Sequence, residues 1–210
     1  MRYFIGVIIG YLLGMLSPTY LFSVIKNVDM RKSGTGNLGA TNEMLTLGKK
    51  LGILVMIFDI MKSFIPVLIY KMLYPEEPQL MMEVGLSAIV GHCFPFYLKF
   101  RGGKGVATLA GLVLAYDPLI FLVLFIVGFS FVFLTGYVFS LPISGSAIFP
   151  VLVGLKTRNL VCIILSACAG LVVIVKHSRN FKRIFDGTEM RWKDFVKKRY
   201  KIDKVKKKDK

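Results

Sequence analysis

Charged side chains are scarce along most of this sequence, and acidic ones are the scarcest. The 210 residues contain 12 Asp and Glu against 28 Lys and Arg, and hydrophobic residues make up 55%. No charge occurs from Tyr3 to Ile25, a run of 23 residues, or from Pro118 to Leu155, a run of 38. A soluble domain needs more polar side chains than this to cover its surface, so a soluble protein is excluded.

Cysteine and histidine are also rare. The three cysteines, Cys93, Cys162 and Cys168, form no C-x-x-C pair, and the chain has two histidines. We therefore expect thiols packed as small apolar side chains, no metal site and no cofactor. The long runs lack the two-residue alternation of barrel strands, which favours helices as the elements that cross a membrane.

The apolar runs predict an all-α polytopic membrane protein with about seven short transmembrane helices. A bilayer core of about 30 Å needs roughly 20 apolar residues in a helix. The candidate spans are residues 3–25, 51–70, 80–98, 105–117, 119–139, 141–156 and 159–175. Segments 105–117 and 141–156 are short and rich in glycine, so they are expected to be tilted, partial or re-entrant. Residues 1–176 form the predicted transmembrane domain and residues 177–210 a basic cytoplasmic tail.

Basic residues gather in three clusters, which follow the first, third and last candidate spans. An odd number of spans places all three clusters on one side of the membrane. The positive-inside rule identifies that side as the cytoplasm and puts the N-terminus outside. Lys156 and Arg158 lie on the opposite side and are exceptions to the pattern.

The net charge of +16 is concentrated in the tail and beside the spans. This distribution argues against nucleic acid as a partner. A basic tail that also contains Trp192, Phe195, Val196 and Tyr200 suits an anionic lipid surface. A solvated tail that only sets the topology fits the same residues equally well.

The first polar cluster on the predicted cytoplasmic face is the turn from Gly34 to Asn42. It holds three glycines, two threonines and two asparagines in nine residues. Its formal G-x-G-x-x-G match has no strand before it, which excludes a dinucleotide fold. Glycines let backbone N–H groups approach an anion, and Thr and Asn add side-chain donors. A polar binding turn is therefore favoured over a flexible loop.

The second cluster runs from His92 to Thr108 and contains a Gly-Gly-Lys-Gly turn before an apolar segment. A helix N-terminus offers free N–H groups and partial positive charge to a phosphate, and Lys104 adds a full charge. The glycine spacing of a Walker A loop is absent, so ATP chemistry is not indicated.

The third cluster begins at His177 and Asn180 and reaches Glu189. Neither His92 nor His177 belongs to a His-x4-Asp acyltransferase pattern, no Ser-His-Asp triad is readable, and both histidines suit structural roles as well. Inside a predicted span, Asp59 and Lys62 lie three residues apart on one helix face. They either pair structurally or organise a site.

Taken in order, these blocks resemble the PlsY family, the acyl-phosphate-dependent glycerol-3-phosphate acyltransferases of bacteria. The resemblance extends from Ser17 to Glu189. It depends on Asp29-Met30-Arg31 with the Gly34 to Asn42 turn, Asp59 to Lys62, Gly91 to Thr108, Gly136-Tyr137, His177, Asn180 and Gly187-Thr188-Glu189. It implies that acyl phosphate and glycerol 3-phosphate give 1-acylglycerol 3-phosphate (lysophosphatidate) and phosphate. The reaction would take place at the inner face of the bacterial cell membrane, without coenzyme A or acyl carrier protein.

By the same resemblance, the three clusters form one site. The implied catalytic residues are Thr35, Asn37, Lys104, His177 and Asn180, and the implied substrate-binding residues are Gly36, Asn42, Arg101, Gly102, Gly103, Gly105 and Thr108. Because phosphate is a good leaving group, no strong protein nucleophile is expected. We expect Lys104 and the turn N–H groups to neutralise the phosphates, and a substrate phosphate to take the proton of the attacking hydroxyl.

Three positions depart from the family pattern. Thr35 replaces the usual serine and keeps a hydroxyl, Leu45 replaces an arginine that Lys49 or Arg101 could substitute, and Leu141-Pro142 replaces consecutive serines. Two alternatives therefore stay open. One is a divergent paralogue with weak or altered activity. The other is a transport or binding protein for organic phosphates, although the internal repeats and midplane polar residues of a carrier are not evident.

Overall fold

The computed structural model describes residues 1–189 and 191–193, and this part of the chain folds into a bundle of helices without a strand. Five helical segments are long and apolar enough to cross a membrane, and α9 with α10 makes a sixth if that bent pair is counted as one. An all-α membrane protein is thereby confirmed. Residues 194–210 lie outside the described residues, and with them Phe195, Val196 and Tyr200 of the predicted lipid-binding tail.

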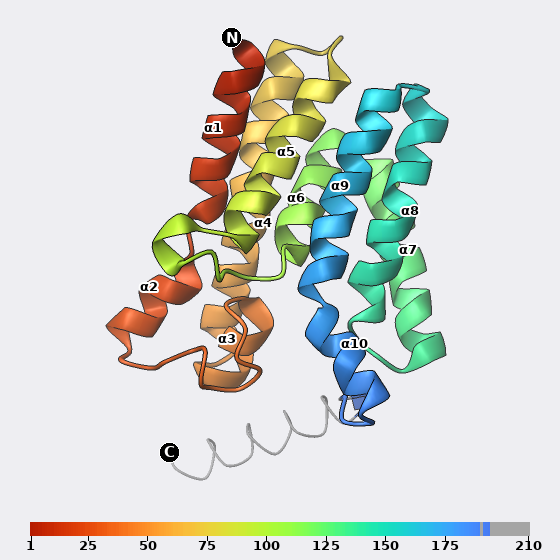
Figure 1. Cartoon of the computed structure of the whole chain (residues 1–210). Coiled ribbons are helices and arrows are strands. Elements are labelled where there is room, and N and C mark those ends of the chain that lie inside the picture. Colours follow the sequence, from red (N-terminus) through yellow and green to blue (C-terminus); the bar gives the residue numbers. More distant parts are fainter. Residues whose placement is uncertain (190, 194–210) are drawn as a thin grey trace.

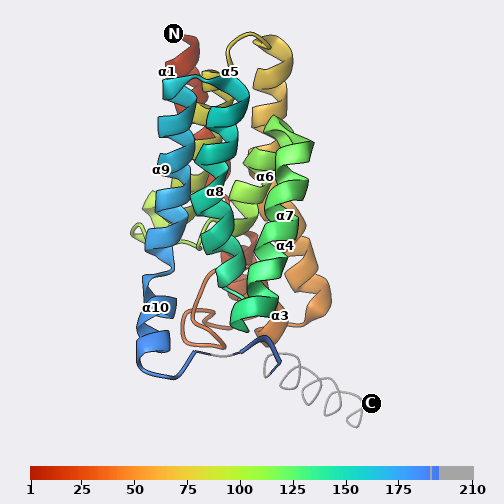
Figure 2. The same cartoon turned by 90° about the vertical axis from the view of Figure 1, so that its right-hand side faces the viewer.

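Most of the helices lie side by side and run roughly along the bundle axis (Figures 1 and 2). In chain order they are α1 Arg2–Met15, α2 Pro18–Ile25, α3 Ala40–Thr46, α4 Lys49–Leu73, α5 Pro78–Cys93, the 3-10 turn η1 Phe96–Leu98, α6 Val106–Tyr116, α7 Pro118–Thr135, α8 Ser140–Thr157, α9 Leu160–Lys176 and α10 Ser178–Phe185.

The predicted first span, residues 3–25, is interrupted between α1 and α2. Pro18 begins α2, and the Ser17 hydroxyl caps that helix by accepting from the N–H of Tyr20. Proline has no N–H to continue the hydrogen bonding of α1, which explains the break. The α1 helix ends at Met15, and α2 leads away toward the opposite end of the bundle from the N-terminus (Figure 1).

The two segments expected to be incomplete differ from each other. The α6 helix has 11 residues, which at 1.5 Å per residue gives only about 16 Å, far less than a bilayer core. The α8 helix has 18 residues and is long enough to cross despite Pro142 and Pro150. Helix α6 is therefore shorter than a full crossing, as expected for 105–117, whereas α8 reaches the length of one. The predicted span 80–98 corresponds to the candidate span Pro78–Leu98, in which α5 ends at Cys93 and the η1 turn follows.

Helix α1 packs closely on α5 through three glycines one turn apart, Gly6, Gly10 and Gly14. A methyl group at Gly10 or Gly14 would collide with the backbone of α5 at Val84 and Ala88. Small residues at four-residue spacing let two membrane helices approach to backbone contact. Further packing joins α4 to α5 and α6, α5 to α6 and α9, and α8 to α7 and α9.

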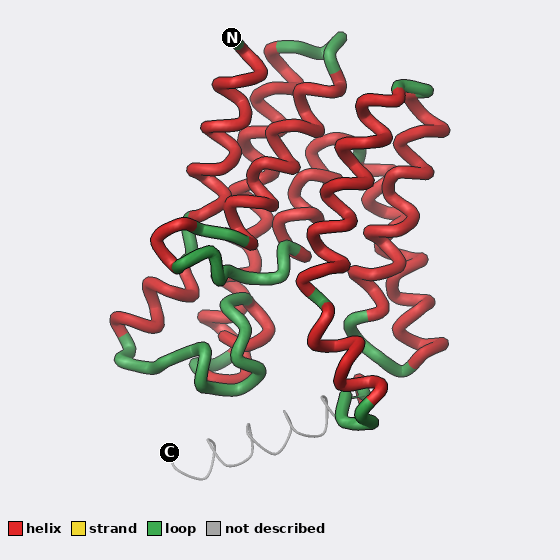
Figure 3. Tube along the Cα trace, in the orientation of Figure 1, coloured by secondary structure: helices red, strands yellow, loops and turns green. Residues whose placement is uncertain are grey.

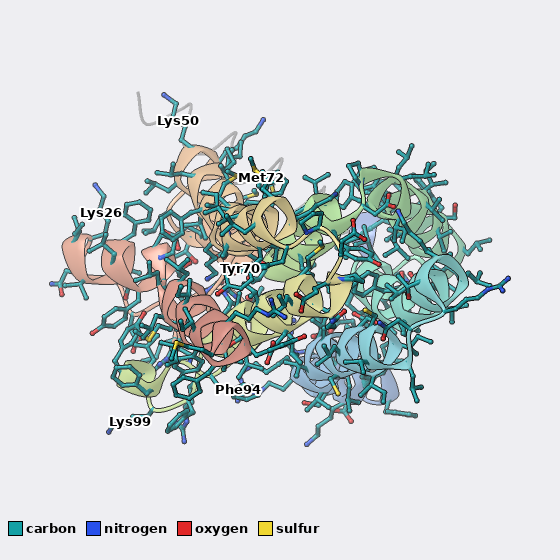
Figure 4. All side chains as sticks on the ribbon, turned by 90° about the horizontal axis from the view of Figure 1, so that it is seen from above. Lys26, Lys50, Tyr70, Met72, Phe94 and Lys99 are labelled. Carbon is teal, nitrogen blue, oxygen red and sulfur yellow. The ribbon has the colours of Figure 1, made fainter. Side chains whose placement is uncertain are left out.

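The long loops gather at one end of the bundle, while the connections near the N-terminal end are short (Figure 3). All three polar clusters therefore lie toward the same end, as the charge pattern predicts. Seen along the bundle axis, Lys26, Lys50 and Lys99 point outward at its periphery (Figure 4).

Lys156, a basic residue on the predicted outer side, has an acidic partner at the opposite end of the bundle. Its ammonium pairs with Asp117, whose carboxylate also caps α7 by accepting from the N–H groups of Leu119 and Ile120. Lys71 donates to the carbonyl oxygens of Ala115 and Tyr116 at the end of α6, at 3.1 and 2.9 Å. These cations are held by local partners, so they do not contradict the orientation taken from the larger clusters.

Candidate functional site

The first cluster is a rigid turn held by Asn42, whose side chain is fully buried. Its Oδ1 accepts from the N–H of Thr35 at 2.6 Å, and its Nδ2 donates to the carbonyl of Met30 at 2.9 Å. Gly34 and Gly36 have φ angles of +58° and +72°, which favour glycine. Asn42 therefore shapes the turn from inside, while Thr35 is exposed and Asn37 half-buried where a substrate can reach them.

In the second cluster, two backbone donors that we expected to face an anion are already used. The N–H of Gly102 donates to the carbonyl of Cys93, and that of Gly103 donates to the carbonyl of His92, both at 3.1 Å. These carbonyls lie at the end of α5, where no further helical turn supplies donors. Gly102 and Gly103 thus close the turn onto α5, and their N–H groups are not available to a phosphate in this structure.

The backbone donors available to an anion lie further along the chain, in the first turn of α6. Gly105 precedes this helix with a φ of +79°, and no side chain caps the helix. The first turn of a helix leaves the N–H groups of Val106, Ala107 and Thr108 without intrahelical acceptors. The positive end of the helix dipole lies at the same place. Arg101 is exposed beside this turn, and Thr108 is buried with an unpartnered hydroxyl.

Lys104 connects the second cluster to the third. Its Nζ donates to Oδ1 of Asn180 at 2.6 Å, and Nδ2 of Asn180 donates to Oε1 of Glu189 at 2.7 Å. Burial lowers the pKa of Lys104 to about 8. The glutamate fixes which way the amide points, and the amide in turn orients the ammonium. Lys104 is thus half-buried next to the N-terminus of α6. The low dielectric constant of this environment strengthens its attraction to an anion.

His177 lies at the bend of 47° between α9 and α10 and is 3% exposed. Its Nδ1 donates to the carbonyl of Val173 at 2.8 Å, so the neutral ring has its lone pair on Nε2. The bond fixes the ring at the end of α9. Lys176, the residue before it, donates to the carbonyl of Cys93 at 3.0 Å. This bond links α9 to the end of α5, which the second turn, Gly102–Gly105, contacts.

The first and second clusters meet along backbone. A methyl group at Gly103 would lie 2.6 Å from the carbonyl oxygen of Leu38, and Arg31 donates to the carbonyls of Leu98 and Arg101 at 3.3 and 3.2 Å. The structure therefore brings all three clusters together around the second turn. Among the described residues, no side-chain hydrogen bond joins Thr35 or Asn37 to Lys104, His177 or Asn180.

Sequence reasoning passed over the partners that organise these residues. Glu189 was recognised as part of a cluster without a role, and its bond to Asn180 spans nine residues of chain. Asp59 and Lys62 were noted as a pair, but their contact with His92, 30 residues from Lys62, could not be read from spacing. Glu43 was not considered at all: it is fully buried beside the first turn, and neither carboxylate oxygen has a hydrogen-bond partner.

The two departures that remove polar side chains fall on different elements. Leu45 is half-buried on α3, and Pro142 is buried in the first turn of α8. Lys49, one candidate substitute for the missing arginine, is exposed at the start of α4. Arg31 lies closer to the second turn through its two backbone contacts.

Known proteins match this chain over nearly its full length. The family model for glycerol-3-phosphate acyltransferase matches residues 4–187. Glycerol-3-phosphate acyltransferase from Macrococcus caseolyticus is 42% identical over 184 residues, which cover 87% of this chain and 93% of the relative. The enzyme of the same name from Syntrophotalea carbinolica is 38% identical over 193 residues, covering 91% and 98%.

Solved structures agree with the sequence comparison. The crystal structure of PlsY, an integral membrane glycerol 3-phosphate acyltransferase, in its glycerol 3-phosphate form superposes with a TM-score of 0.84 at 32% identity, covering 91% of this chain and 96% of that one. Its lysophosphatidic acid form gives a TM-score of 0.81. The chain described here therefore belongs to the glycerol-3-phosphate acyltransferase family of integral membrane proteins.

Proposed function

We propose that this membrane enzyme transfers an acyl group from acyl phosphate to glycerol 3-phosphate at the cytoplasmic face, with the three polar clusters as its site. A hydroxyl oxygen of glycerol 3-phosphate forms the new ester bond to the acyl carbon. The bond between that carbon and the phosphate oxygen breaks, and inorganic phosphate leaves with the electron pair. The products are 1-acylglycerol 3-phosphate and phosphate, so no cofactor is consumed.

The observation that carries this proposal is the position of Lys104. Its ammonium lies at the uncapped start of α6 and is oriented by Asn180 and Glu189. A lysine charge and a helix N-terminus together favour a phosphate. The helices on either side are apolar enough to accommodate an acyl chain, so a single substrate can present its phosphate to the turn and its tail to the bilayer.

The roles of the other residues follow from what they can donate. Thr35, Asn37 and the α6 N–H groups would contact phosphate or the developing oxyanion, and His177 and Asn180 would orient glycerol 3-phosphate. A phosphate oxygen of the substrate would accept the proton of the attacking hydroxyl, because no side chain is arranged as a nucleophile–base pair among the described residues. Asn42, Gly102 and Gly103 support the turns instead of contacting substrate.

The proposed orientation places the N-terminus outside and α10 in the cytoplasm, with residues 1–176 as the transmembrane domain and 177–210 as a tail. The tail would meet anionic lipid headgroups. Trp192 supports this placement: its backbone N–H donates to the carbonyl of Gly136 at 2.9 Å, and its ring packs edge-on against Phe133, so this part of the tail lies on the end of α7.

A donor comparison in detergent tests the proposal. Purified protein is supplied with labelled glycerol 3-phosphate and either palmitoyl phosphate or palmitoyl coenzyme A. We expect labelled lysophosphatidate from palmitoyl phosphate alone. Product from the coenzyme A ester would overturn the proposed donor. No product from either donor, with glycerol 3-phosphate still bound, would instead favour a divergent paralogue of the family.

A further inference from the structure

A buried polar network lies inside the bundle next to the site, and the proposed chemistry does not use it. Asp59 and Lys62 on α4 are 3% and 5% exposed. Nζ of Lys62 lies 2.8 Å from Oδ1 of Asp59, 2.6 Å from Nδ1 of His92 and 3.0 Å from the carbonyl oxygen of Leu16. An ammonium group has three protons, and these three acceptors take all of them.

The carbonyl of Leu16 is available because the first span is broken there. In a continuous helix it would accept from the N–H of Tyr20, but that N–H donates to the Ser17 hydroxyl instead. Lys62 supplies the missing donor to Leu16. Tyr97 supplies a donor to the preceding residue, because its hydroxyl donates to the carbonyl of Met15 at 2.6 Å. The network therefore connects the α1–α2 break to α4 and α5.

Lys62 also determines the state of the His92 ring. Nδ1 accepts a hydrogen bond from the ammonium, so the neutral ring carries its own proton on Nε2. Nε2 faces Gly103, where an added methyl group would collide with it. The backbone carbonyl of His92 accepts from the N–H of the same glycine at 3.1 Å. One residue thus supports Gly103 through its ring and its backbone.

Gly103 is also the residue at which the first turn meets the second, through the carbonyl of Leu38, and it directly precedes Lys104. We propose that Asp59, Lys62 and His92 are positioning residues. They hold the Gly102–Gly105 turn in its position beside α5 and thereby fix the position of Lys104. The inference rests on the proposed function, since it assumes that this turn binds a substrate phosphate. Acyl transfer requires closely positioned reacting groups, and a shift of about 1 Å can reduce rates about 100-fold.

A network that merely pairs helices would affect folding and leave the kinetic constants of the folded enzyme unchanged. His92→Asn separates the two roles. Its amide oxygen can still accept from Lys62 near the position of Nδ1, while the part of the ring under Gly103 is lost. A second variant, Asp59→Asn with Lys62→Met, removes both charges together, because removal of one would leave the other buried without a partner.

The experiment measures kcat and KM for glycerol 3-phosphate, equilibrium binding of labelled glycerol 3-phosphate, and the thermal unfolding midpoint in detergent. We expect His92→Asn to keep a midpoint close to that of the unchanged protein while KM and the dissociation constant rise about 10-fold or more. The double variant should show the same loss. Lys71→Met is the matched control, because Lys71 is another partly buried lysine that donates to backbone carbonyls, at the far end of the bundle. It should change the midpoint and leave KM unchanged.

Unaltered KM and binding in both network variants would overturn the inference, as would an equal rise in KM for Lys71→Met. Failure of the proposed function looks different. In that case the unchanged protein forms no product from palmitoyl phosphate, and the binding measurement alone decides whether His92 positions the turn. If the unchanged protein binds no glycerol 3-phosphate, both the inference and the assignment of the turn are wrong.

Discussion

Nζ of Lys104 lies 2.6 Å from Oδ1 of Asn180, a residue 76 positions further along the chain. This bond joins the turn before α6 to the helix after the last apolar segment. It gives the site a cation whose direction is set by an amide and, through that amide, by Glu189.

The first prediction concerns pH. Burial lowers the pKa of Lys104 to about 8, so the ammonium loses its proton as the pH rises through that value. Phosphate affinity should therefore fall, and kcat/KM for glycerol 3-phosphate should decline above about pH 8. A pH series of kcat/KM checks this. In Lys104→Arg, which stays charged, the remaining activity should show no such decline. An alkaline limb that is the same in both proteins would assign the titration to another group.

A second prediction concerns the close contact at Gly103. Gly103→Ala places a methyl group against Nε2 of His92 and the carbonyl of Leu38, so the turn must move away from α5. Activity should fall at least 10-fold. The control is Gly145→Ala on α8, where nothing lies within 4 Å of the added methyl group. Its activity should match that of the unchanged protein. Comparable rates in both variants would mean that the turn tolerates displacement.

The third prediction concerns Glu43, which is buried without hydrogen-bond partners. Burial raises the pKa of its carboxyl from 4.5 to about 7. The folded protein therefore holds this proton more tightly than the unfolded chain, and the free energy of unfolding should fall as the pH rises from about 4.5 to about 7. Glu43→Gln removes the titration. We expect the variant to be more stable than the parent at pH 8 and to lose that advantage near pH 4.5, measured by thermal unfolding in detergent. A constant difference at all pH values would show that Glu43 does not titrate in this range.

The fourth prediction concerns the far end of the bundle. Asp117→Ala removes the α7 cap and the partner of Lys156, and should cost about 1–2 kcal/mol of stability without changing KM. Ser130→Ala is the control, since its hydroxyl bonds only the carbonyl of Ile126 within the same helix. Unfolding midpoints in detergent compare the two. A large change in KM for Asp117→Ala would mean that changes at this end of the bundle alter substrate binding at the site.

Hydropathy and charge were sufficient to predict the helical bundle and the gathering of polar clusters at one end. The limits lie where the outcome depends on contacts between distant residues. Pro95 gives a local signal for the end of α5, but the carbonyls of His92 and Cys93 at that end accept from the N–H groups of Gly103 and Gly102, and this removes those donors from the site. Nothing in the neighbourhood of Lys62 indicates that it bonds to His92 and Leu16, because both partners are brought to it by the packing of α1, α4 and α5. The break after Leu16 had a local signal in Pro18, since proline cannot continue the hydrogen bonding of a helix.

The most direct test of the central claim is to measure both products at once. Purified protein in detergent is given palmitoyl phosphate and glycerol 3-phosphate, and phosphate and lysophosphatidate are quantified together for the unchanged protein and for Lys104→Met. We predict equal amounts of the two products from the unchanged protein, and loss of both in a Lys104→Met variant that keeps its unfolding midpoint. Phosphate release without lysophosphatidate, or full turnover in Lys104→Met, would contradict acyl transfer at this site.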